Sequence, residues 1–279
     1  MNSGKEIDEE ALAEAYNRAL ALEKAGKLDE AAAAYHEVLR LDPDDHGGAA
    51  VRLAAMGRGE TPPKAPDAYV ATLFDQHAED FDLILVDQLG YHVPEMVRDL
   101  LSEVAPGPYA RMLDLGCGTG LAGEYLSDRA SFLVGVDIAE GMVEMADERE
   151  FYDDLYVGEA VAFLAASLED GEAPFDLVVA TDVLPYLGGV EELFSGIAAQ
   201  TEKDAVLVFS TETLDAESLA GRPFMVGPKH RFAHDIGYIR KALAKAGFAS
   251  AEERPITVRH EEGEPVPGHL VLARRVAEA

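Results

Sequence analysis

Eight residues near the middle of the chain, LDLGCGTG at positions 113–120, restrict its fold more than any other segment. They hold three glycines, an acid ahead of them and the only cysteine of the chain. Glycine reaches positive φ and lets a ligand approach the backbone, but it loses more conformational entropy on folding than other residues. Three interpretations are open at this point: a tight turn, a loop for a nicotinamide-type dinucleotide, and a loop for another adenosyl compound.

The sequence around this loop alternates short apolar runs with helical segments. The runs are RMLDL, SFLVGVD, DLYVG, FDLVVATDVL and AVLVFSTE, which begin at positions 111, 131, 154, 175 and 205. They are typical of buried parallel strands. Helices are expected over 121–127, 140–149, 161–167, 190–201 and 236–246, and residues 257–275 indicate two more strands joined by an acidic turn. The alternation predicts an α/β fold with a doubly wound, Rossmann-like sheet of seven strands.

The spacing of the glycines separates the two ligand interpretations. A dinucleotide loop has the pattern G-x-G-x-x-G, whereas Gly116, Gly118 and Gly120 give G-x-G-x-G. Asp114 lies two residues ahead of the first glycine, where a carboxylate would repel a pyrophosphate and attract a cationic amino acid group. S-adenosylmethionine carries an ammonium and a sulfonium. The spacing and the acid together favour this compound over a nicotinamide.

Further acids follow the next strands of the predicted sheet. Asp137 ends the second strand, Glu159 follows the third, and Asp182 follows the fourth. Ligands of open parallel sheets bind at the carboxyl ends of the strands, so these acids are expected along one edge. There Asp137 can bind both ribose hydroxyls and Glu159 can accept from the adenine amine. Each acid alone is also compatible with a helix cap or a solvated side chain.

Residues 110–275 resemble a class I S-adenosylmethionine-dependent methyltransferase, because LDLGCGTG is close to the first motif of that family and VGVDIAEGMVEMA and FDLVVATDVLPYLG continue the match. The resemblance implies that the glycines border the methionine part, with Asp114 supporting its ammonium. It also implies Asp137 at the ribose, and Glu159 with Ala160 at the adenine. Cys117 is expected to be a packing residue of the loop. The expected cofactor-binding residues are Asp114, Gly116, Cys117, Gly118, Gly120, Asp137, Ile138, Glu159, Ala160, Asp182 and Phe81.

The N-terminal segment has a helical, alanine-rich pattern of its own. Residues 25–45 resemble the second half of a tetratricopeptide (TPR) repeat, with Gly26 at the turn, Ala31 at a close helix contact, Tyr35 in the groove and Pro43 at the end. A single repeat cannot bury its apolar faces, so we expect it to dock on the rest of the chain, a second copy or a partner. The whole chain resembles bacterial predicted methyltransferases that bear an N-terminal TPR unit.

The segment between this unit and the glycine loop is predicted to be a linker followed by two cap helices. The helices are expected over 68–89 and 93–104. On the first, Phe74, His77 and Phe81 recur at helical spacing on one face. The expected divisions of the chain are 1–57 (TPR-like), 58–66 (linker), 67–109 (cap helices) and 110–279 (cofactor-binding domain).

Methyl transfer requires alignment of donor and acceptor, and a base only when the acceptor must lose a proton. Candidates for the acceptor side come from the first cap helix, from Tyr186 after the fourth strand, and from GPKHRFAHD at 227–235. An ordinary core stripe and an exposed helix N-terminus are the alternatives for the first and last. Arg231, a rare cation, favours a small anionic acceptor. The catalytic candidates are His234, Tyr186 and His77, and the acceptor-binding candidates are Arg231, His230, Tyr186 and Phe74.

Charge and composition limit the partners. With 53 acids against 23 lysines and arginines the net charge is −30, which repels nucleic acid and anionic lipid. No apolar run approaches ~20 residues and no secretory signal is evident, so a cytoplasmic location is expected. One cysteine excludes an internal disulfide, and no metal site is expected.

The sequence therefore predicts a methyltransferase that acts on an O or N atom of a small molecule, for which Arg231 suggests an anionic class. Two alternatives stay open: a protein methyltransferase whose TPR-like segment recruits the acceptor, and an interaction module that binds cofactor without turnover.

Overall fold

The computed structural model describes residues 8–166 and 172–276 and contains one large, mostly parallel sheet. Its strand order is β3-β2-β1-β4-β5-β9-β8, in which β1 to β5 run parallel and β9 is antiparallel to both neighbours. The strands are β1 (Met112–Leu115), β2 (Leu133–Asp137), β3 (Asp154–Val157), β4 (Phe175–Ala180), β5 (Thr201–Glu212), β8 (Phe248–Glu261) and β9 (Glu264–Arg275). The predicted seven-stranded, doubly wound sheet is confirmed.

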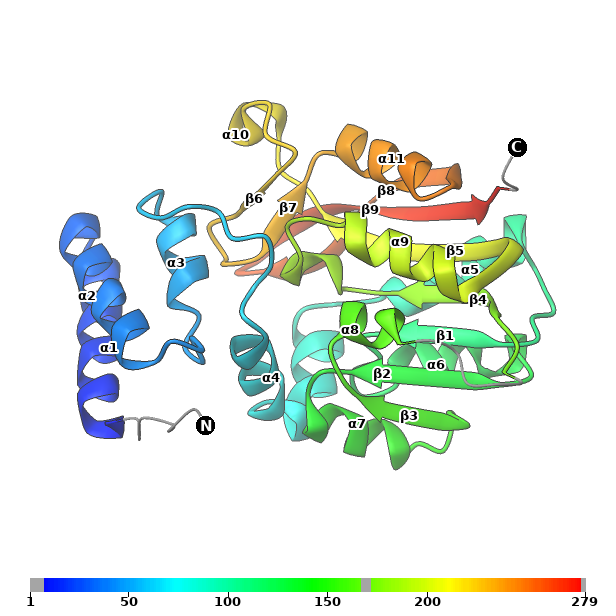
Figure 1. Cartoon of the computed structure of the whole chain (residues 1–279), viewed down its shortest axis with the longest axis horizontal. Coiled ribbons are helices and arrows are strands. Elements are labelled where there is room, and N and C mark those ends of the chain that lie inside the picture. Colours follow the sequence, from blue (N-terminus) through cyan, green and yellow to red (C-terminus); the bar gives the residue numbers. More distant parts are fainter. Residues whose placement is uncertain (1–7, 167–171, 277–279) are drawn as a thin grey trace.

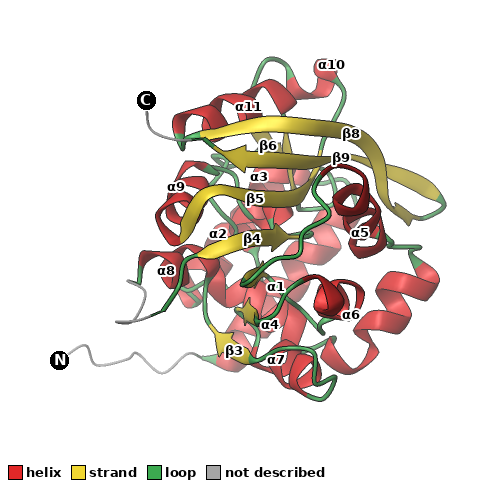
Figure 2. Cartoon of the chain, turned by 90° about the vertical axis from the view of Figure 1, so that its right-hand side faces the viewer, coloured by secondary structure: helices red, strands yellow, loops and turns green. Residues whose placement is uncertain are grey.

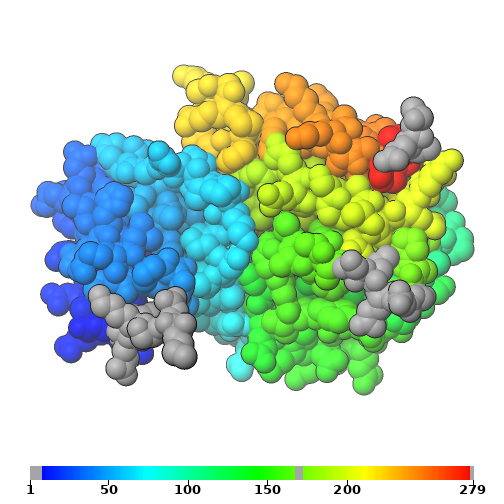
Figure 3. Space-filling model, in the orientation of Figure 1, coloured from blue at the N-terminus to red at the C-terminus, as the bar shows by residue number. Residues whose placement is uncertain are grey.

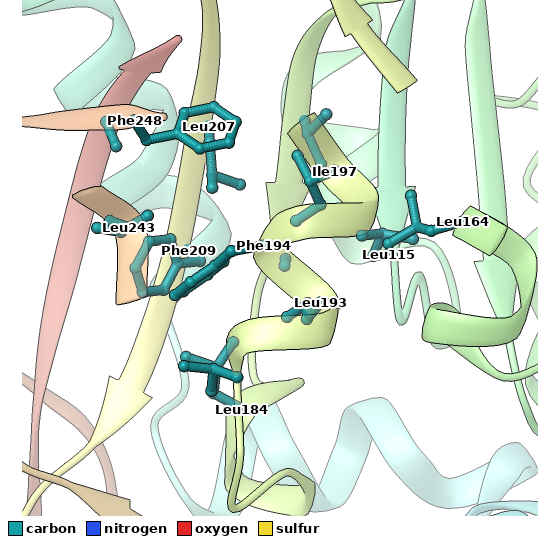
Figure 4. Packing of buried hydrophobic residues seen from close by; sticks show 14 of the residues in the cluster. Leu115, Leu164, Leu184, Leu193, Phe194, Ile197, Leu207, Phe209, Leu243 and Phe248 are labelled. Carbon is teal, nitrogen blue, oxygen red and sulfur yellow. The ribbon is translucent and has the colours of Figure 1, made fainter. Parts of the chain in front are cut away.

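Helices cover both faces of this sheet (Figure 2). They are α5 (Val93–Val104), α6 (Leu121–Leu126), α7 (Glu140–Asp147), α8 (Ala160–Ala165), α9 (Glu191–Gln200) and α11 (Ile236–Lys245). One core lies between the sheet and α8, α9 and α11, where Phe194 of α9 packs beside Phe209 of β5 (Figure 4). A second core lies on the other face, against α5 and α6. Burial on both faces explains why the strands are continuous apolar runs.

The prediction of one continuous cap helix over residues 68–89 is wrong. Residues 68–89 form α4 (Asp67–Asp75), a 3-10 turn η1 (Ala78–Asp80) and a π-helical segment η2 (Leu83–Gln88). The break falls at His77, whose amide donates to the Phe74 carbonyl and whose carbonyl accepts from Asp80. These i to i+3 bonds tighten the turn and break the predicted stripe. Phe74 and Phe81 nevertheless meet, with ring centroids 5.7 Å apart, while His77 is exposed.

Three helices form the N-terminal unit: α1 (Glu9–Lys24), α2 (Leu28–Leu41) and α3 (Ala49–Ala55). The residues expected for the repeat take their places, since Gly26 has φ +71° in the turn and Ala31 and Tyr35 are fully buried. Helix α3 continues past this hairpin and packs through Val51 against Val226 and Phe232. Of the three docking partners expected for the N-terminal unit, the rest of the chain is the one that it contacts in this structure (Figure 3).

The surface that receives α3 is a hairpin that sequence reasoning did not anticipate. Strands β6 (Phe224–Val226) and β7 (Phe232–His234) pair antiparallel after β5, following the short helix α10 (Ala216–Leu219). The linker is also fixed to the core, because the Pro63 carbonyl accepts from Gly188 and Gly189 and the Ala65 amide donates to Tyr186. The carboxyl ends of β1 and β4 therefore point toward α4 and the linker (Figure 1).

Candidate active site

The carboxyl ends of β1 to β4 open into one cavity, with about 970 Å³ of empty space, part of it continuous with solvent. The linker and α4 close its far side, contributing Lys64, Asp67 and Val70. The predicted site residues that line it are Gly116, Cys117, Gly118, Asp137, Ile138, Glu159, Ala160, Asp182, Phe81, Phe74 and Tyr186. Segments distant in sequence thus meet at the edge where acids were expected.

The glycine loop needs its glycines for two different reasons. Gly116, Gly118 and Gly120 have φ of +68°, +54° and +91°, which other residues rarely adopt. At Gly116 a Cβ would lie 2.5 Å from Val183 Cγ2, so packing excludes a side chain. A Cβ at Gly118 would meet nothing within 4 Å, and this residue lines the cavity. Gly120 starts α6 away from the cavity lining, so only the first two glycines can border a ligand.

Asp137 connects the end of β2 to the glycine loop. Its two carboxylate oxygens accept from the amides of Gly118 and Ala139, both at 2.9 Å. Burial raises the pKa of Asp137, and these backbone hydrogen bonds oppose that rise. The side chain is buried against the loop yet still lines the cavity. It can therefore fix the loop and accept hydrogen bonds from a ligand.

Asp114 lies on β1 outside the cavity lining. Its Oδ2 accepts from the Tyr152 hydroxyl at 2.6 Å, and its Oδ1 is buried without a hydrogen-bond partner. Burial raises the pKa of this carboxyl to about 7. A buried acceptor with no partner is costly, and a cation brought to the neighbouring loop would offset that cost electrostatically.

Glu159 has two partners at the end of β3. Its Oε2 accepts from the Ala162 amide at 2.7 Å, so it caps α8, and its Oε1 lies 3.6 Å from Lys64 Nζ. Lys64 is also 2.7 Å from Asp67 Oδ1. Sequence reasoning missed Lys64 because it treated residues 58–66 as a linker, and no local signal marks this lysine. Glu159 therefore caps a helix, as one of the alternatives expected, and it also lines the cavity.

Asp182 is held more rigidly than the other acids. Its backbone has φ +61° and its amide donates to Ser210 Oγ at 2.9 Å. Arg259 Nη1 donates to both of its carboxylate oxygens at 3.1 Å. Arg259 is only 3% exposed and also pairs with Glu212 and Glu261. One side of Asp182 therefore meets this buried arginine, while the residue also lines the cavity.

Arg231 belongs to the same ion-pair cluster and does not line the cavity. Its Nε donates to Glu212 at 2.7 Å, and it pairs with Glu261. Both of its carboxylate partners are shared with Arg259. His230 points elsewhere, to Glu23 of α1 at 3.4 Å, within the contact between the hairpin and the N-terminal unit. Neither residue is placed to bind an acceptor in this cavity.

His234 is fully buried between the hairpin and the sheet. Its Nε2 lies 3.2 Å from the Gly188 carbonyl and its Nδ1 lies 3.1 Å from Thr211 Oγ1. Burial lowers the pKa of His234 to about 4, so the imidazole is neutral at pH 7 and both nitrogens are engaged. Neither His234 nor the exposed His77 lines the cavity. Of the three catalytic candidates, the two histidines are therefore separated from the cavity, and Tyr186 alone lines it.

The end of the cavity beyond β4 is aromatic and apolar. Tyr186 and Phe74 meet edge to face with ring centroids 5.3 Å apart. Burial raises the pKa of Tyr186 far above its ordinary value, so its phenol stays protonated. Sequence reasoning missed the remaining wall, which consists of Leu85, Tyr91, Pro94, Leu121 and Thr181. Leu85 comes from η2, Pro94 from α5 and Leu121 from α6, while Tyr91 lies between η2 and α5 and Thr181 follows β4.

The lining suits an adenosyl amino acid compound. The open space at Gly118 admits a close approach to the backbone, and acceptor oxygens of Asp137 and Glu159 lie at successive strand ends. The four lining carboxylates against one lysine suit a ligand with positive charge. Within residues 8–166 and 172–276 no group of His, Cys, Asp or Glu side chains is arranged to hold a metal ion. Nor does any helix in these ranges have the length and apolar character needed to cross a bilayer.

Comparison with known families agrees with this geometry. A family model described as "Methyltransferase domain" matches residues 65–253, and a tetratricopeptide repeat model matches residues 14–45. The ubiquinone biosynthesis O-methyltransferase of Maricaulis maris is 27% identical over 63% of this chain and 76% of its own length. The 18S rRNA (guanine-N(7))-methyltransferase of Bos taurus is 48% identical, but over only 17% of each chain. The chain thus spans less than a fifth of that relative.

Two solved structures share the fold. N-methyltransferase NodS of Bradyrhizobium japonicum, in complex with S-adenosyl-L-homocysteine, has a TM-score of 0.57 and 16% identity over 74% of this chain and 98% of its own. Magnesium protoporphyrin IX methyltransferase of Synechocystis, with bound SAM, has a TM-score of 0.53 and 19% identity over 75% of this chain and 96% of its own.

Proposed function

Since this chain belongs to the methyltransferase-domain family, we propose that it transfers a methyl group from S-adenosylmethionine to an O or N atom of a small molecule. The observation that carries the proposal is the convergence of the Gly116–Gly118 loop, Asp137 and Glu159 on one cavity. These groups come from three neighbouring strand ends, in the order β1, β2 and β3. Relatives named as O-methyltransferases support the class of reaction.

Along the sheet edge, different residues bind different parts of the donor. The backbone at Gly118 borders the amino acid part, Asp137 accepts from the ribose hydroxyls, and Glu159 with Ala160 borders the adenine. Asp114, behind the loop, provides negative charge for the ammonium. Lys64 pairs with Glu159 and so orients its carboxylate.

The bound donor supplies an activated methyl group, which an acceptor lone pair attacks in line while the carbon–sulfur bond breaks and its electrons go to sulfur. The chain contributes alignment and exclusion of water. Phe74, Tyr186 and Leu85 cover the reacting end with apolar surface. A hydroxyl or amine acceptor also loses a proton. Asp182 is the carboxylate at this end, and it can accept that proton directly or through water.

The charge of the acceptor that was expected from the sequence is not carried over into this proposal. A small anionic acceptor was inferred from Arg231, and that arginine is paired with two carboxylates outside the cavity. The rRNA substrate in the names of some relatives is not carried over, because those matches cover only 17–35% of this chain. The net charge of −30 also opposes a nucleic acid acceptor.

The activity can be tested with S-adenosylmethionine labelled in its methyl group and a fractionated metabolite extract. We expect transfer of label to a small molecule, and its loss in Asp137→Asn. Glu192→Gln, an exposed change on α9, is the control that retains transfer. Binding of S-adenosylhomocysteine without transfer to any fraction would instead support the non-catalytic interaction module, and label on protein would support a polypeptide acceptor.

A further inference from the structure

We propose that the acceptor is a neutral or cationic compound with an amine or hydroxyl group, and that Asp182 binds that group. The inference rests on the proposed methyl transfer and names the class of acceptor for the same cavity. It replaces the anionic acceptor that the sequence suggested. Three features support it: the layout of the cavity, the contacts that hold Asp182, and the charges along the adjoining groove.

The layout assigns one end of the cavity to the acceptor. Along the sheet edge the order is β3, β2, β1, β4, which places Glu159, Asp137, the glycine loop and Asp182 in succession. A donor that extends from Glu159 to the loop ends beside β4. The wall beyond that point has no assigned donor contact, and besides Phe74 and Tyr186 it includes Leu85, Tyr91, Pro94, Thr181 and Asp182.

Asp182 is the charged side chain of that wall, and its position is fixed from three directions. The hydrogen bond that its backbone amide donates to Ser210 Oγ, the two hydrogen bonds from Arg259 and the backbone at φ +61° restrain it together. A left-handed backbone is unusual for a residue other than glycine and clusters at functional sites. A carboxylate has room for further hydrogen bonds after accepting two. A preorganised acceptor of this kind selects a partner that donates.

The cations near Asp182 are unavailable to a ligand. Arg259 is 3% exposed, and it and Arg231 together contact Asp182, Glu212 and Glu261. This cluster thus has three carboxylates for two guanidinium groups. Lys64, the lysine on the cavity wall, lies at the adenine end beside Glu159. An anionic acceptor would meet no free positive charge among the described residues of the β4 end.

A second groove adjoins the same end and is acidic as well. It shares Tyr91, Pro94 and Leu121 with the main cavity and lies between η2, α5 and α6. Its walls carry Asp82, Asp87 and Glu124, while its arginine, Arg149, is already paired with Asp82 and Glu124. The three carboxylates outnumber the one arginine, and an excess of one sign of charge raises the local concentration of ligands of the opposite sign. This groove therefore suits the approach of a cation and opposes that of an anion.

The test uses three small aromatic probes of similar size that differ in charge: cationic benzylamine, neutral benzyl alcohol and anionic benzoate. Each is titrated into the protein saturated with S-adenosylhomocysteine, with binding followed by ligand-observed NMR at pH 7.5. We expect benzylamine to bind at least about tenfold more tightly than benzoate, with benzyl alcohol between them. Asp182→Asn should weaken benzylamine at least about tenfold and remove the preference, since a hydrogen-bonded ion pair is lost.

Glu192→Gln removes one exposed carboxylate on α9 and is the matched control for net charge; it should leave the preference unchanged. Benzoate binding as tight as benzylamine, or an unchanged preference in Asp182→Asn, would overturn the inference. Affinity for S-adenosylhomocysteine is measured in every variant and reports an intact donor site. Absence of that affinity in the unmodified protein would refute the proposed function itself, which distinguishes the two failures.

Discussion

Asp137 combines a structural and a ligand-facing position in one side chain. Its carboxylate holds Gly118 and Ala139 through their amides while it lines the cavity. Gly118 presents bare backbone to the same space. At the scale of residues, the site therefore depends on the absence of a side chain at Gly118 and on the hydrogen bonds that the Asp137 carboxylate accepts.

Gly118→Ala should weaken binding of S-adenosylhomocysteine by about tenfold or more, because its methyl group would project from a φ of +54° into the cavity. The matched control is Gly221→Ala. Gly221 also has a positive φ and open space at its Cβ, but it is an exposed residue outside the cavity lining. Calorimetric titration measures both. Equal affinity in the two variants would show that the loop does not border the ligand.

Asp114→Asn should change how stability depends on pH. Burial raises the pKa of Asp114 to about 7 in the folded state, above the ordinary value of 3.8. The native state therefore binds the proton more tightly, and this group lowers stability as pH rises from about 4 to 7. The loss is on the order of 4 kcal/mol, and Asn removes it. Urea unfolding at pH 5 and pH 8 measures the difference, and parallel profiles for the two proteins would contradict it.

The hairpin β6–β7 is the element that links the sheet to the N-terminal helices. His234 of β7 bonds to the loop after β4 through Gly188, and Phe232 packs with Val51 of α3. A Cβ at Gly188 would lie 2.6 Å from the Phe224 ring. At this scale a residue expected to be catalytic lies between two elements, fully buried and with both ring nitrogens in contact with polar partners.

The free energy of unfolding should depend on His234 in acid. Burial lowers its pKa to about 4 from an ordinary 6.5, so the unfolded chain binds the proton more tightly. Stability is then lost as pH falls from 6.5 toward 4, by roughly 3 kcal/mol. His234→Gln should flatten this part of the profile, measured by urea unfolding at pH 4.5 and pH 7. A variant with the slope of the parent would contradict this assignment.

The elements differ in how well the sequence predicts them. Strands β1 to β5 and α5 follow from apolar runs and helical periodicity, which are local signals, and LDLGCGTG predicts its own position at a strand end. The break at His77 follows from i to i+3 bonds that helical periodicity does not reveal. The β6–β7 hairpin packs against α3. The position of Lys64 depends on the hydrogen bond between the neighbouring Ala65 and Tyr186 and on its contact with Glu159. Segments whose conformation depends on distant partners carry no local pattern to detect.

At the scale of the molecule, the N-terminal helices lie beyond the carboxyl ends of the strands, on the side of the cavity (Figure 1). Their contact with the hairpin includes a polar group, in which Glu23 pairs with Arg52 at 3.1 Å and lies 3.4 Å from His230. The linker that follows them forms part of the cavity wall. The helical unit and the cavity therefore belong to one packed structure.

Val51→Ala should destabilise the hairpin as well as α3. Val51 is fully buried among Val226 and Phe232, and removing its methyl groups costs about 2 kcal/mol. Hydrogen exchange followed by mass spectrometry should show faster exchange in α3 and in β7 together. Val157→Ala, at a residue that is 57% exposed, is the control. Faster exchange confined to α3 would mean that the two elements open independently.

The central claim is that the cavity at the ends of β1 to β4 takes an adenosyl methyl donor. Titration calorimetry of the full chain with S-adenosylhomocysteine, with NAD as the competing candidate, tests it most directly. We predict one site for S-adenosylhomocysteine, weakened at least about tenfold by Asp137→Asn, and no measurable heat with NAD. Tight binding of NAD, or no binding of the sulfur compound by a folded protein, would contradict the claim.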